Sequence, residues 1–261
     1  MKILVAGSPT NGADKLCIKH DVGKLYSILN EKKHIAEWER GQFLLVDSGA
    51  HSWNKSTINK VGMHSAKKLP DVKDHMKFYL DFMNQHKNKE VTFVELDVYG
   101  NVPKDTVDGW YRDVMSIKGK FNCMRVYHPV LDGGTLSVLK GWIDEGQSYI
   151  GLGLETMPMF DKVFALTKDK VKYHGFAMTR VEVIEKYPFF SVDSTTPIST
   201  VIFGTRVNKY LKVFGKDEII RQRSPRIFTE DSPRLEEAII DVKRTEEYIT
   251  ALWAKRGVLW K

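Results

Sequence analysis

The chain has 261 residues, which is enough for one large domain or two small ones. Hydrophobic residues make up 42% of it and charged residues 28%, the balance of a soluble globular protein, and no run of about 18 apolar residues predicts a membrane span. Two cysteines, Cys17 and Cys123, are too few for a disulfide framework or a cysteine-rich metal site, so the reducing cytoplasm is the expected location.

The net charge is +7, and the isoelectric point lies near 9.1. This balance fits a polyanionic partner such as nucleic acid, and it fits an ordinary basic protein equally well. Charge by itself does not separate these two interpretations.

Short apolar segments rich in β-branched and aromatic residues predict strands along the whole chain. The N-terminal stretch is too short and too polar for a signal peptide and is typical of a first strand. In chain order, the expected strands are Lys2–Ala6, Phe43–Asp47, Val91–Asp97, Cys123–His128, Ser148–Gly153, Lys172–Phe176, Phe189–Asp193 and Val201–Phe203.

Between these segments, apolar residues recur at the spacing of an amphipathic helix. Thr179 and Glu182 have the spacing of a capping box and predict a helix that runs through Tyr187. A C-terminal helix is expected over 232–256, beginning at Ser232-Pro233. The predicted inner faces are Val72, Met76, Tyr79 and Met83; Val107, Trp110, Val114 and Ile117; Leu136, Leu139 and Ile143; and Leu235, Ile239, Val242, Ile249 and Trp253.

Alternating strands and helices indicate parallel strands joined by right-handed crossovers. Eight such units in a chain of this length predict an α/β protein with a (β/α)₈ TIM-type barrel, forming a single domain over 1–261. A doubly wound open sheet is the alternative. Its dinucleotide-binding form is disfavoured because no G-x-G-x-x-G follows the first strand.

Two basic stretches lie outside the predicted elements. The segment 48–70 has no acidic residue, and a loop of this length is usually functional or disordered. The alternative for both stretches is an ordinary solvated surface. The basic residues expected to hold phosphate groups are Lys55, Lys60, Lys67 and Lys68 in the first stretch and Arg221, Arg223 and Arg226 in the second.

Polar side chains and glycines gather at the C-terminal ends of the predicted strands, which in a barrel meet at the face that carries active sites. A single Asp in this place often caps the next helix. Several carboxylates together indicate either cleavage of a glycosidic bond or metal binding, and a non-catalytic nucleic-acid-binding barrel is a third possibility. The residues at these ends are Asp47, Glu95, Asp97, His128, Gly151, Gly153, His174, Gly175 and Asp193.

The order of these motifs resembles the tRNA-guanine transglycosylase superfamily. The stretch LLVDSGAHS at 44–52 resembles the family's D-S-G-G-F motif, and VELDV at 94–98 resembles its base-reading strand. The stretch YIGLGLE at 149–155 is similar to its glycine-bearing substrate strand. The segment YHGFAMTRVEVIEKYPFFSVDSTTP at 173–197 is similar to the phage and bacterial branch that inserts 7-deazaguanine bases into DNA.

The chain also departs from the family's pattern. The tRNA enzymes hold zinc through three Cys and one His near the C-terminus, whereas no Cys follows Cys123 here, so no zinc site is expected. Ala50 and His51 replace the second glycine and the aromatic residue of the D-S-G-G-F motif, and His128 stands where the tRNA enzymes have Gln. These departures move the expected substrate away from tRNA.

The resemblance implies a two-step base exchange without a cofactor, with DNA and a 7-deazaguanine base as partners and no membrane involvement. Asp193 would be the nucleophile and Asp47 the proton-transfer residue, while Asp97, or Glu95 in its place, would read the base. A nucleoside or nucleic-acid N-glycosidase remains an alternative, and His128 and His174 are equally well interpreted as core histidines. The expected substrate-binding set is Ser48, Gly49, His51, Glu95, Asp97, His128, Gly151, Gly153, His174, Gly175 and Met178.

Overall fold

Eight parallel strands form a closed barrel in the order of the chain, from β1 to β8. The computed structural model describes residues 1–7, 11–29, 43–53, 71–99, 101–130, 133–167, 171–198 and 233–260. The predicted (β/α)₈ barrel is therefore confirmed. The strands are β1 (Lys2–Ala6), β2 (Gly23–Ser27), β3 (Leu44–Asp47), β4 (Thr92–Val94), β5 (Asn122–Tyr127), β6 (Tyr149–Leu152), β7 (Lys172–Gly175) and β8 (Ser191–Ser194).

Helices alternate with these strands, as the periodicity predicts. Their positions follow the apolar faces seen in the sequence, with the addition of three elements that were not predicted, α1, η2 and α6. The described helices are α1 (Asn11–Lys19), α3 (Val72–Gln85), α4 (Lys104–Ser116), α5 (Ser137–Asp144), the short 3-10 helix η2 (Leu154–Met159), α6 (Phe160–Thr167), α7 (Val181–Lys186) and α9 (Pro233–Lys255).

The chain divides into two units by its contacts, one made of 1–25 and 127–261 and the other of 26–126. Nothing in the structure tests the expectation of a single domain over 1–261. The two units are therefore described one at a time.

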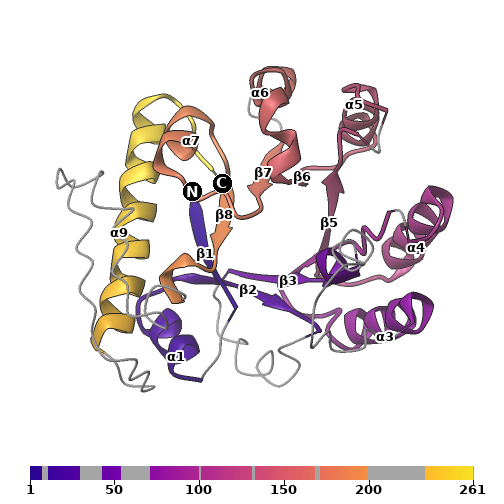
Figure 1. Ribbon diagram of the computed structural model, residues 1–261, viewed down its shortest axis with the longest axis horizontal. Coiled ribbons are helices and arrows are strands. Elements are labelled where there is room, and N and C mark those ends of the chain that lie inside the picture. Colours follow the sequence, from indigo (N-terminus) through magenta and orange to yellow (C-terminus); the bar gives the residue numbers. More distant parts are fainter. Residues whose placement is uncertain are drawn as a thin grey trace, which may run out of the picture. The chain divides into compact units, whose positions relative to one another are not determined.

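In the first unit, β1 pairs with β2 and β8, and β7 pairs with β6 and β8. The long helix α9 runs beside β1, with α1 and α7 next to it (Figure 1). Its predicted apolar face is confirmed, because Leu235, Ile239, Val242, Ile249 and Trp253 are all buried.

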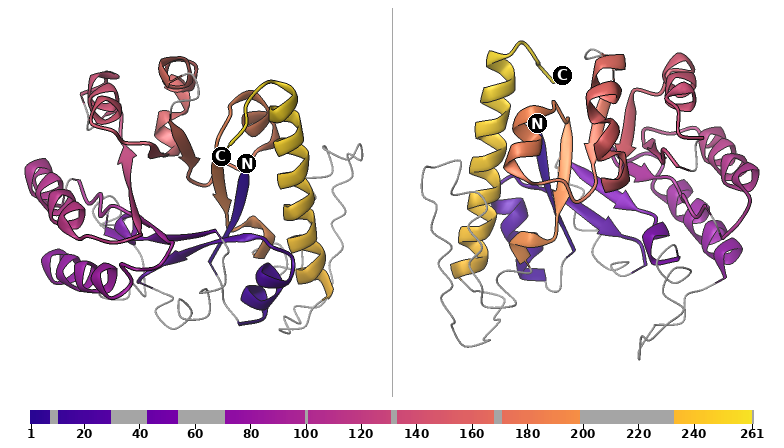
Figure 2. Two further views of the ribbon diagram at one scale, coloured as in Figure 1. Left: turned by 180° about the vertical axis from the view of Figure 1, so that it is seen from behind. Right: turned by 45° about the horizontal axis from the view of Figure 1, so that its top comes forward.

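In the second unit, β3, β4 and β5 are parallel neighbours, and the helices α3 and α4 lie side by side (Figure 2). Tyr79 of α3 donates its hydroxyl hydrogen toward the carbonyls of Val46 and Val94, at 3.1 and 2.8 Å. Phe93 packs edge-on against Tyr79 and Phe82. This aromatic contact layer anchors α3 to the ends of β3 and β4, the strands that precede two of the candidate carboxylates.

The strand β2 is absent from the predicted set, and a buried charge explains the omission. Its sequence, GKLYS, contains Lys24, which is fully buried and forms an ion pair of 3.0 Å with the equally buried Asp14 of α1. The Lys24 ammonium also donates to the carbonyl of Gly7 at 2.9 Å. A lysine in a short segment lowers its apparent strand character, although here its charge is compensated.

Three further expectations need comment. The Asp193 strand is the eighth of the barrel rather than the seventh, and the expected strand Val201–Phe203 lies outside the described residues. The capping box at Thr179 is wrong, because α7 has Arg180 as its N-cap without a side-chain hydrogen bond. The segment 48–70 was expected to be a loop, but residues 50–53 within it are helical.

Candidate active-site residues

Asp193 lies near the end of β8 and is only 7% exposed. Its Oδ1 accepts a hydrogen bond of 2.9 Å from the backbone N–H of Ala177, and Nε2 of His174 lies 3.3 Å from the same oxygen. Among the described residues, the other oxygen, Oδ2, has no partner within hydrogen-bond or ion-pair distance. One oxygen of Asp193 is therefore held in place, whereas the other has no such contact in the described part of the chain.

The N–H group of Ala177 is aimed at Asp193 by an unusual backbone conformation. Ala177 has a φ of +54°, in the left-handed region that residues with a side chain rarely adopt. Such strain of about 1–3 kcal/mol persists where the surrounding structure imposes it, and it is concentrated at functional sites. This donor follows directly after Phe176 in the β7–α7 connection.

His174 is fully buried, in contrast to the expectation that it contacts substrate. Its Nδ1 lies 2.6 Å from the hydroxyl oxygen of Ser191. The ring of Phe176 packs edge-on against the imidazole, with the two ring centroids 4.6 Å apart. The structure therefore places His174 behind Asp193, where it touches the carboxylate and the core.

The repeated Val-Asp-Ser pattern has a common structural basis in its serines. The Ser48 hydroxyl oxygen accepts from the N–H of Ala50 at 3.4 Å, and that of Ser194 accepts from the N–H of Thr196 at 3.0 Å. In each copy, the serine hydroxyl accepts from the backbone N–H two residues later. This hydrogen bond closes the turn after the strand. Asp193 accepts its hydrogen bond from the backbone N–H of Ala177 and not from the turn that follows β8.

Asp47 accepts a hydrogen bond from the backbone of the turn that directly follows its own strand. Its Oδ2 accepts from the N–H of Gly49 at 3.1 Å. Gly49 has a φ of +84°, and a Cβ on it would lie 2.5 Å from Cδ1 of Leu29, so only glycine fits. Ser48 is fully buried and donates to the carbonyl of Glu95 at 2.9 Å, which makes it a structural residue.

Glu95 and Asp97 were both candidates for reading the base, and their environments differ. The carboxylate of Glu95 accepts from the N–H of Val126 at 2.6 Å and lies 3.3 Å from Nε of Arg125. Arg125 also donates to Asp108 of α4. Burial by itself lowers the pKa of Arg125, but the negative charges of Glu95 and Asp108 raise it above its ordinary value. Glu95 is thus held by a buried ion pair.

Asp97 follows β4 and is 9% exposed. Burial is the main cause of the raised pKa of Tyr79, and the negative charges of Asp47 and Asp97 contribute to it. Both carboxylates therefore lie within electrostatic reach of the same phenol. This neighbourhood places Asp47 and Asp97 in one region of the second unit, past the ends of β3 and β4.

In the first unit, His128 and Glu155 form a pair that the sequence analysis recognised only in part. Nδ1 of His128 lies 3.0 Å from Oε1 of Glu155. A Cβ on Gly153 would lie 2.3 Å from the Glu155 carboxylate, so this glycine makes room for the carboxylate. Glu155 is the last residue of the YIGLGLE stretch. An acidic residue so close to a strand end was the sequence signal that could have identified Glu155 as a candidate site residue.

The other substrate-binding candidates have mixed placements. A Cβ on Gly175 would lie 2.9 Å from Cε1 of Phe189 and 3.1 Å from Cβ of Met178, so Gly175 permits close packing. Met178 is 1% exposed, and Gly151 is buried within β6. His51 is exposed and lies among the helical residues 50–53.

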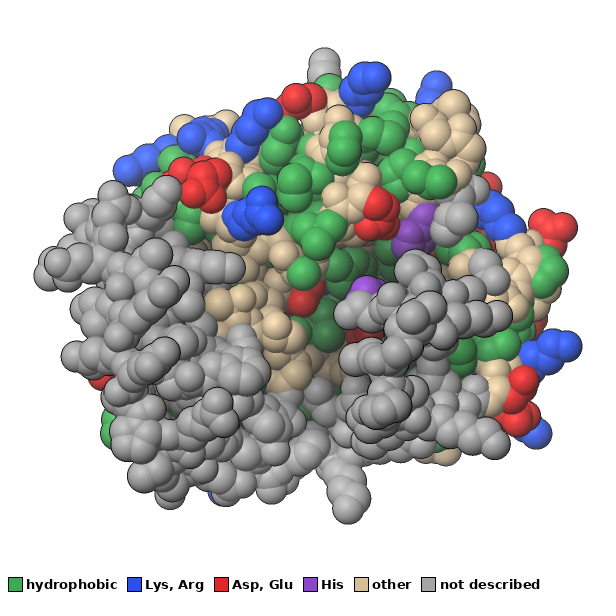
Figure 3. Space-filling model, in the orientation of Figure 1, with side chains coloured by type: hydrophobic (Ala, Val, Ile, Leu, Met, Phe, Trp, Pro, Cys, Tyr) green, Lys and Arg blue, Asp and Glu red, His purple; other side chains and the backbone are tan. Residues whose placement is uncertain are grey.

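The seven basic residues expected to hold DNA phosphates all lie outside the described residues. On the surface above α6 and α7, Lys and Arg side chains are interspersed with acidic and apolar ones (Figure 3). The described surface there is therefore mixed in charge rather than uniformly basic.

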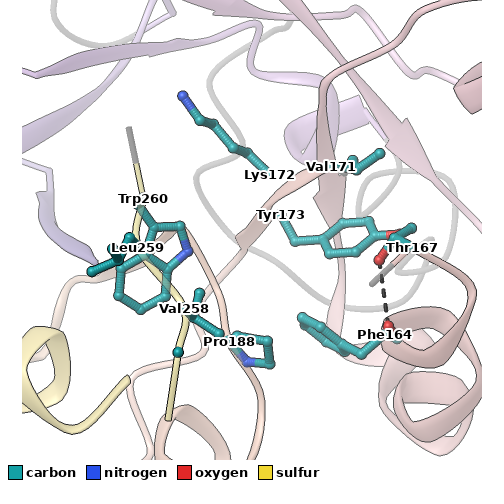
Figure 4. A pocket seen from close by; sticks show the side chains of 10 residues that line it. Phe164, Thr167, Val171, Lys172, Tyr173, Pro188, Val258, Leu259 and Trp260 are labelled. Carbon is teal, nitrogen blue, oxygen red and sulfur yellow. Dashed lines mark hydrogen bonds between the residues drawn. The ribbon is translucent and has the colours of Figure 1, made fainter. Parts of the chain in front are cut away.

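A cavity of about 420 Å³ lies in the first unit, away from the strand ends that carry Asp193. Its walls come from the start of β7, the end of α6 and the segment 257–260 after α9. Figure 4 shows the rings of Tyr173 and Phe164 on one side and Trp260 on the other. Because it opens where β7 begins, this cavity is on the face that contributes to stability in barrels of this kind.

Two features are absent from the residues that the structure describes. No group of three or more His, Cys, Asp or Glu side chains there is arranged to hold a metal ion. Likewise, no helix in the described ranges is both long enough and apolar enough to cross a membrane.

Comparison with known proteins does not identify a family. No family model matches the chain, and neither the curated proteins nor the solved structures contain a match. The fold and the environments of individual residues are therefore the basis for any assignment of function.

Proposed function

We propose that this protein is a base-exchange transglycosylase that replaces guanine in DNA with a 7-deazaguanine derivative through a covalent Asp193–sugar intermediate. The observation that carries the proposal is the asymmetric environment of Asp193. Oδ1 is held by the Ala177 N–H and faced by His174, while Oδ2 has no partner among the described residues. A carboxylate with one oxygen held and one free is suited to nucleophilic attack.

In the first step, Oδ2 of Asp193 forms a bond to the anomeric carbon of the nucleotide, and the bond from that carbon to guanine breaks. The electron pair stays on the guanine nitrogen, which takes a proton from the carboxyl group of Asp47. In the second step, Asp47 accepts the proton of the incoming 7-deazaguanine, whose nitrogen attacks the sugar and releases Asp193. This is the logic of a retaining glycosidase with a purine in place of water.

Asp97 is assigned to read the base in this proposal. A guanine-like ring presents a ring N–H beside an exocyclic amine, and a carboxylate can accept from both. Glu95 is less suited to this role because Arg125 and Val126 already engage its carboxylate. A buried acceptor left unpaired would reject bases that lack these donors.

The decisive experiment is mass spectrometry of nucleosides from DNA incubated with the protein and the cyano, aminomethyl or amidino form of 7-deazaguanine. The expected result is incorporation of one of these bases into DNA but not into tRNA. Asp193→Asn is the matched variant, expected to abolish incorporation and the covalent adduct while retaining the fold. Release of guanine without incorporation would instead identify a hydrolase, and no change in either nucleic acid would overturn the proposal.

The DNA-binding part of the proposal rests on the segment 48–70 and the arginines at 221–226. A duplex hides the bond that is attacked, so the target nucleotide must be flipped out and its phosphates held. Replacing Lys67 and Lys68 by alanine should lower the slope of log affinity against log salt by about one unit per lost contact. An unchanged slope and affinity would show that this segment is ordinary surface.

A further inference from the structure

A chain of three side chains extends from Asp193 into the core of the first unit. The hydroxyl of Tyr149 on β6 lies 2.5 Å from that of Ser191 on β8, which in turn lies 2.6 Å from Nδ1 of His174 on β7. Nε2 of the same imidazole lies 3.3 Å from Oδ1 of Asp193, within ion-pair distance but without the geometry of a hydrogen bond, and it has no other hydrogen-bond partner among the described residues. His174 and Ser191 are opposite each other in the β7–β8 register and are fully buried.

With a neutral imidazole, the hydrogens of this chain have two possible directions. In one, Tyr149 donates to Ser191, Ser191 donates to Nδ1 of His174, and the imidazole carries its hydrogen on Nε2, toward Asp193. In the other, every donor is reversed, and a lone pair of Nε2 faces the carboxylate. The second arrangement places two electron-rich atoms 3.3 Å apart in the core, where such repulsion is poorly screened.

The state of Tyr149 favours the first direction. Burial raises the pKa of Tyr149; the hydrogen bond with Ser191 lowers it by less, and the negative charge of Asp193 raises it further. The phenol therefore keeps its hydrogen at neutral pH and needs an acceptor, which the Ser191 oxygen provides at 2.5 Å.

We propose that Tyr149, Ser191 and His174 form a positioning relay that fixes His174 as its Nε2–H tautomer and directs this N–H toward Oδ1 of Asp193. This inference rests on the proposed function only in that Asp193 is the nucleophile. The relay transfers no proton. It determines which oxygen of Asp193 attacks, namely Oδ2, and which oxygen becomes the carbonyl oxygen of the sugar ester, namely Oδ1.

The relay has its largest effect on the second step of the exchange. When the incoming base nitrogen bonds to the sugar carbon, the bond from that carbon to Oδ2 breaks, and its electron pair returns to the carboxylate. Donors on Oδ1 stabilise the carboxylate more than the neutral ester, because hydrogen bonds to charged groups are the stronger ones. Loss of the relay should therefore slow release of Asp193 and let the covalent intermediate accumulate.

The first test does not depend on activity. In full-length protein labelled with ¹⁵N-histidine, long-range ¹H–¹⁵N spectra at pH 7 report the tautomer of each imidazole, and His174→Gln assigns the signal. We expect Nε2–H in the wild type and a mixture of tautomers in Ser191→Ala and Tyr149→Phe. Tyr187→Phe is the control, because the Tyr187 hydroxyl bonds to the exposed Asp161 on the surface of the same unit. A wild-type Nδ1–H tautomer or imidazolium would overturn the relay.

The second test measures the covalent intermediate. With DNA and the 7-deazaguanine that the wild type incorporates, Ser191→Ala and Tyr149→Phe should show a base-return step slower by roughly fivefold to tenfold, the effect of losing about one hydrogen bond. The steady-state adduct should rise accordingly. If the wild type forms no adduct, the proposed function fails while the spectra still decide the tautomer. If the adduct forms but the variants match the wild type in tautomer and adduct level, the relay alone is refuted.

Discussion

Replacing Glu95 by glutamine should destabilise the protein rather than impair base recognition. The Glu95 carboxylate is almost fully buried, with Val126 N–H at 2.6 Å and Arg125 Nε at 3.3 Å. Removing one partner of a buried ion pair costs about 3–5 kcal/mol. We expect about 3 kcal/mol, because Arg125 keeps its second partner, Asp108. For a domain of this size, that loss lowers the melting temperature by about 6–12 °C.

Asp97→Asn should have the opposite profile. One acceptor of the carboxylate becomes a donor that faces a donor of the base, which weakens binding of the free 7-deazaguanine base by about 1.5–3 kcal/mol, or about tenfold to a hundredfold. The free energy of unfolding should change by less than about 1 kcal/mol, since asparagine keeps the shape of aspartate and one of its two acceptor oxygens.

Urea unfolding followed by circular dichroism and calorimetry with the free base measure both quantities on each variant. Glu90→Gln is the control for the charge change, because Glu90 is exposed in the same unit. Its replacement should change the free energy of unfolding by less than about 0.5 kcal/mol. If Glu95→Gln keeps its stability and loses the base while Asp97→Asn keeps both, the assignment is reversed and Glu95 is the residue that reads the base.

Four other changes test separate parts of the argument. Gly49→Ala should lose about 1–3 kcal/mol of unfolding free energy, because φ is +84° and Leu29 blocks a Cβ; urea melts measure it, and an unchanged midpoint contradicts it. Ala177→Gly should gain up to about 1 kcal/mol by the same assay, since glycine relieves the left-handed strain, and a loss would show that no strain is present. Asp47→Asn should slow exchange by about 10²–10⁴-fold and remove one limb of the pH–rate profile, whereas an unaltered profile would reject the proton-transfer role. Burial by itself raises the pKa of Asp108, but its hydrogen bonds to Lys104 and Arg125 lower it below the ordinary 3.8. Its stabilisation is therefore complete above that value and lost as pH falls through the lower folded pKa, and Asp108→Asn should flatten acid unfolding in that window.

Local pattern was sufficient for most of the barrel and for the choice of strand-end residues. The predicted strands overlap β1 and β3 to β8, because a buried parallel strand is a short apolar run whatever its neighbours are. The inner face of α9 was equally readable, since a 3.6-residue period survives without any knowledge of what covers it. Asp193 and Asp47 could be selected as candidates because a carboxylate at the end of such a run is visible in the sequence itself.

What the tertiary structure decided depends on partners that are distant in sequence. Lys24 is compatible with a buried strand only because Asp14 comes from α1 to meet it, and Glu95 is held by Arg125, which comes from the next strand. The donor to Asp193 is the backbone N–H of Ala177, and a backbone donor cannot be predicted from the residue type at its position. His174 became a buried support because β8 places Ser191 opposite it. Periodicity is a property of one segment, whereas the ionisation and orientation of a buried group depend on charges and donors from other segments, which come together only when the chain folds.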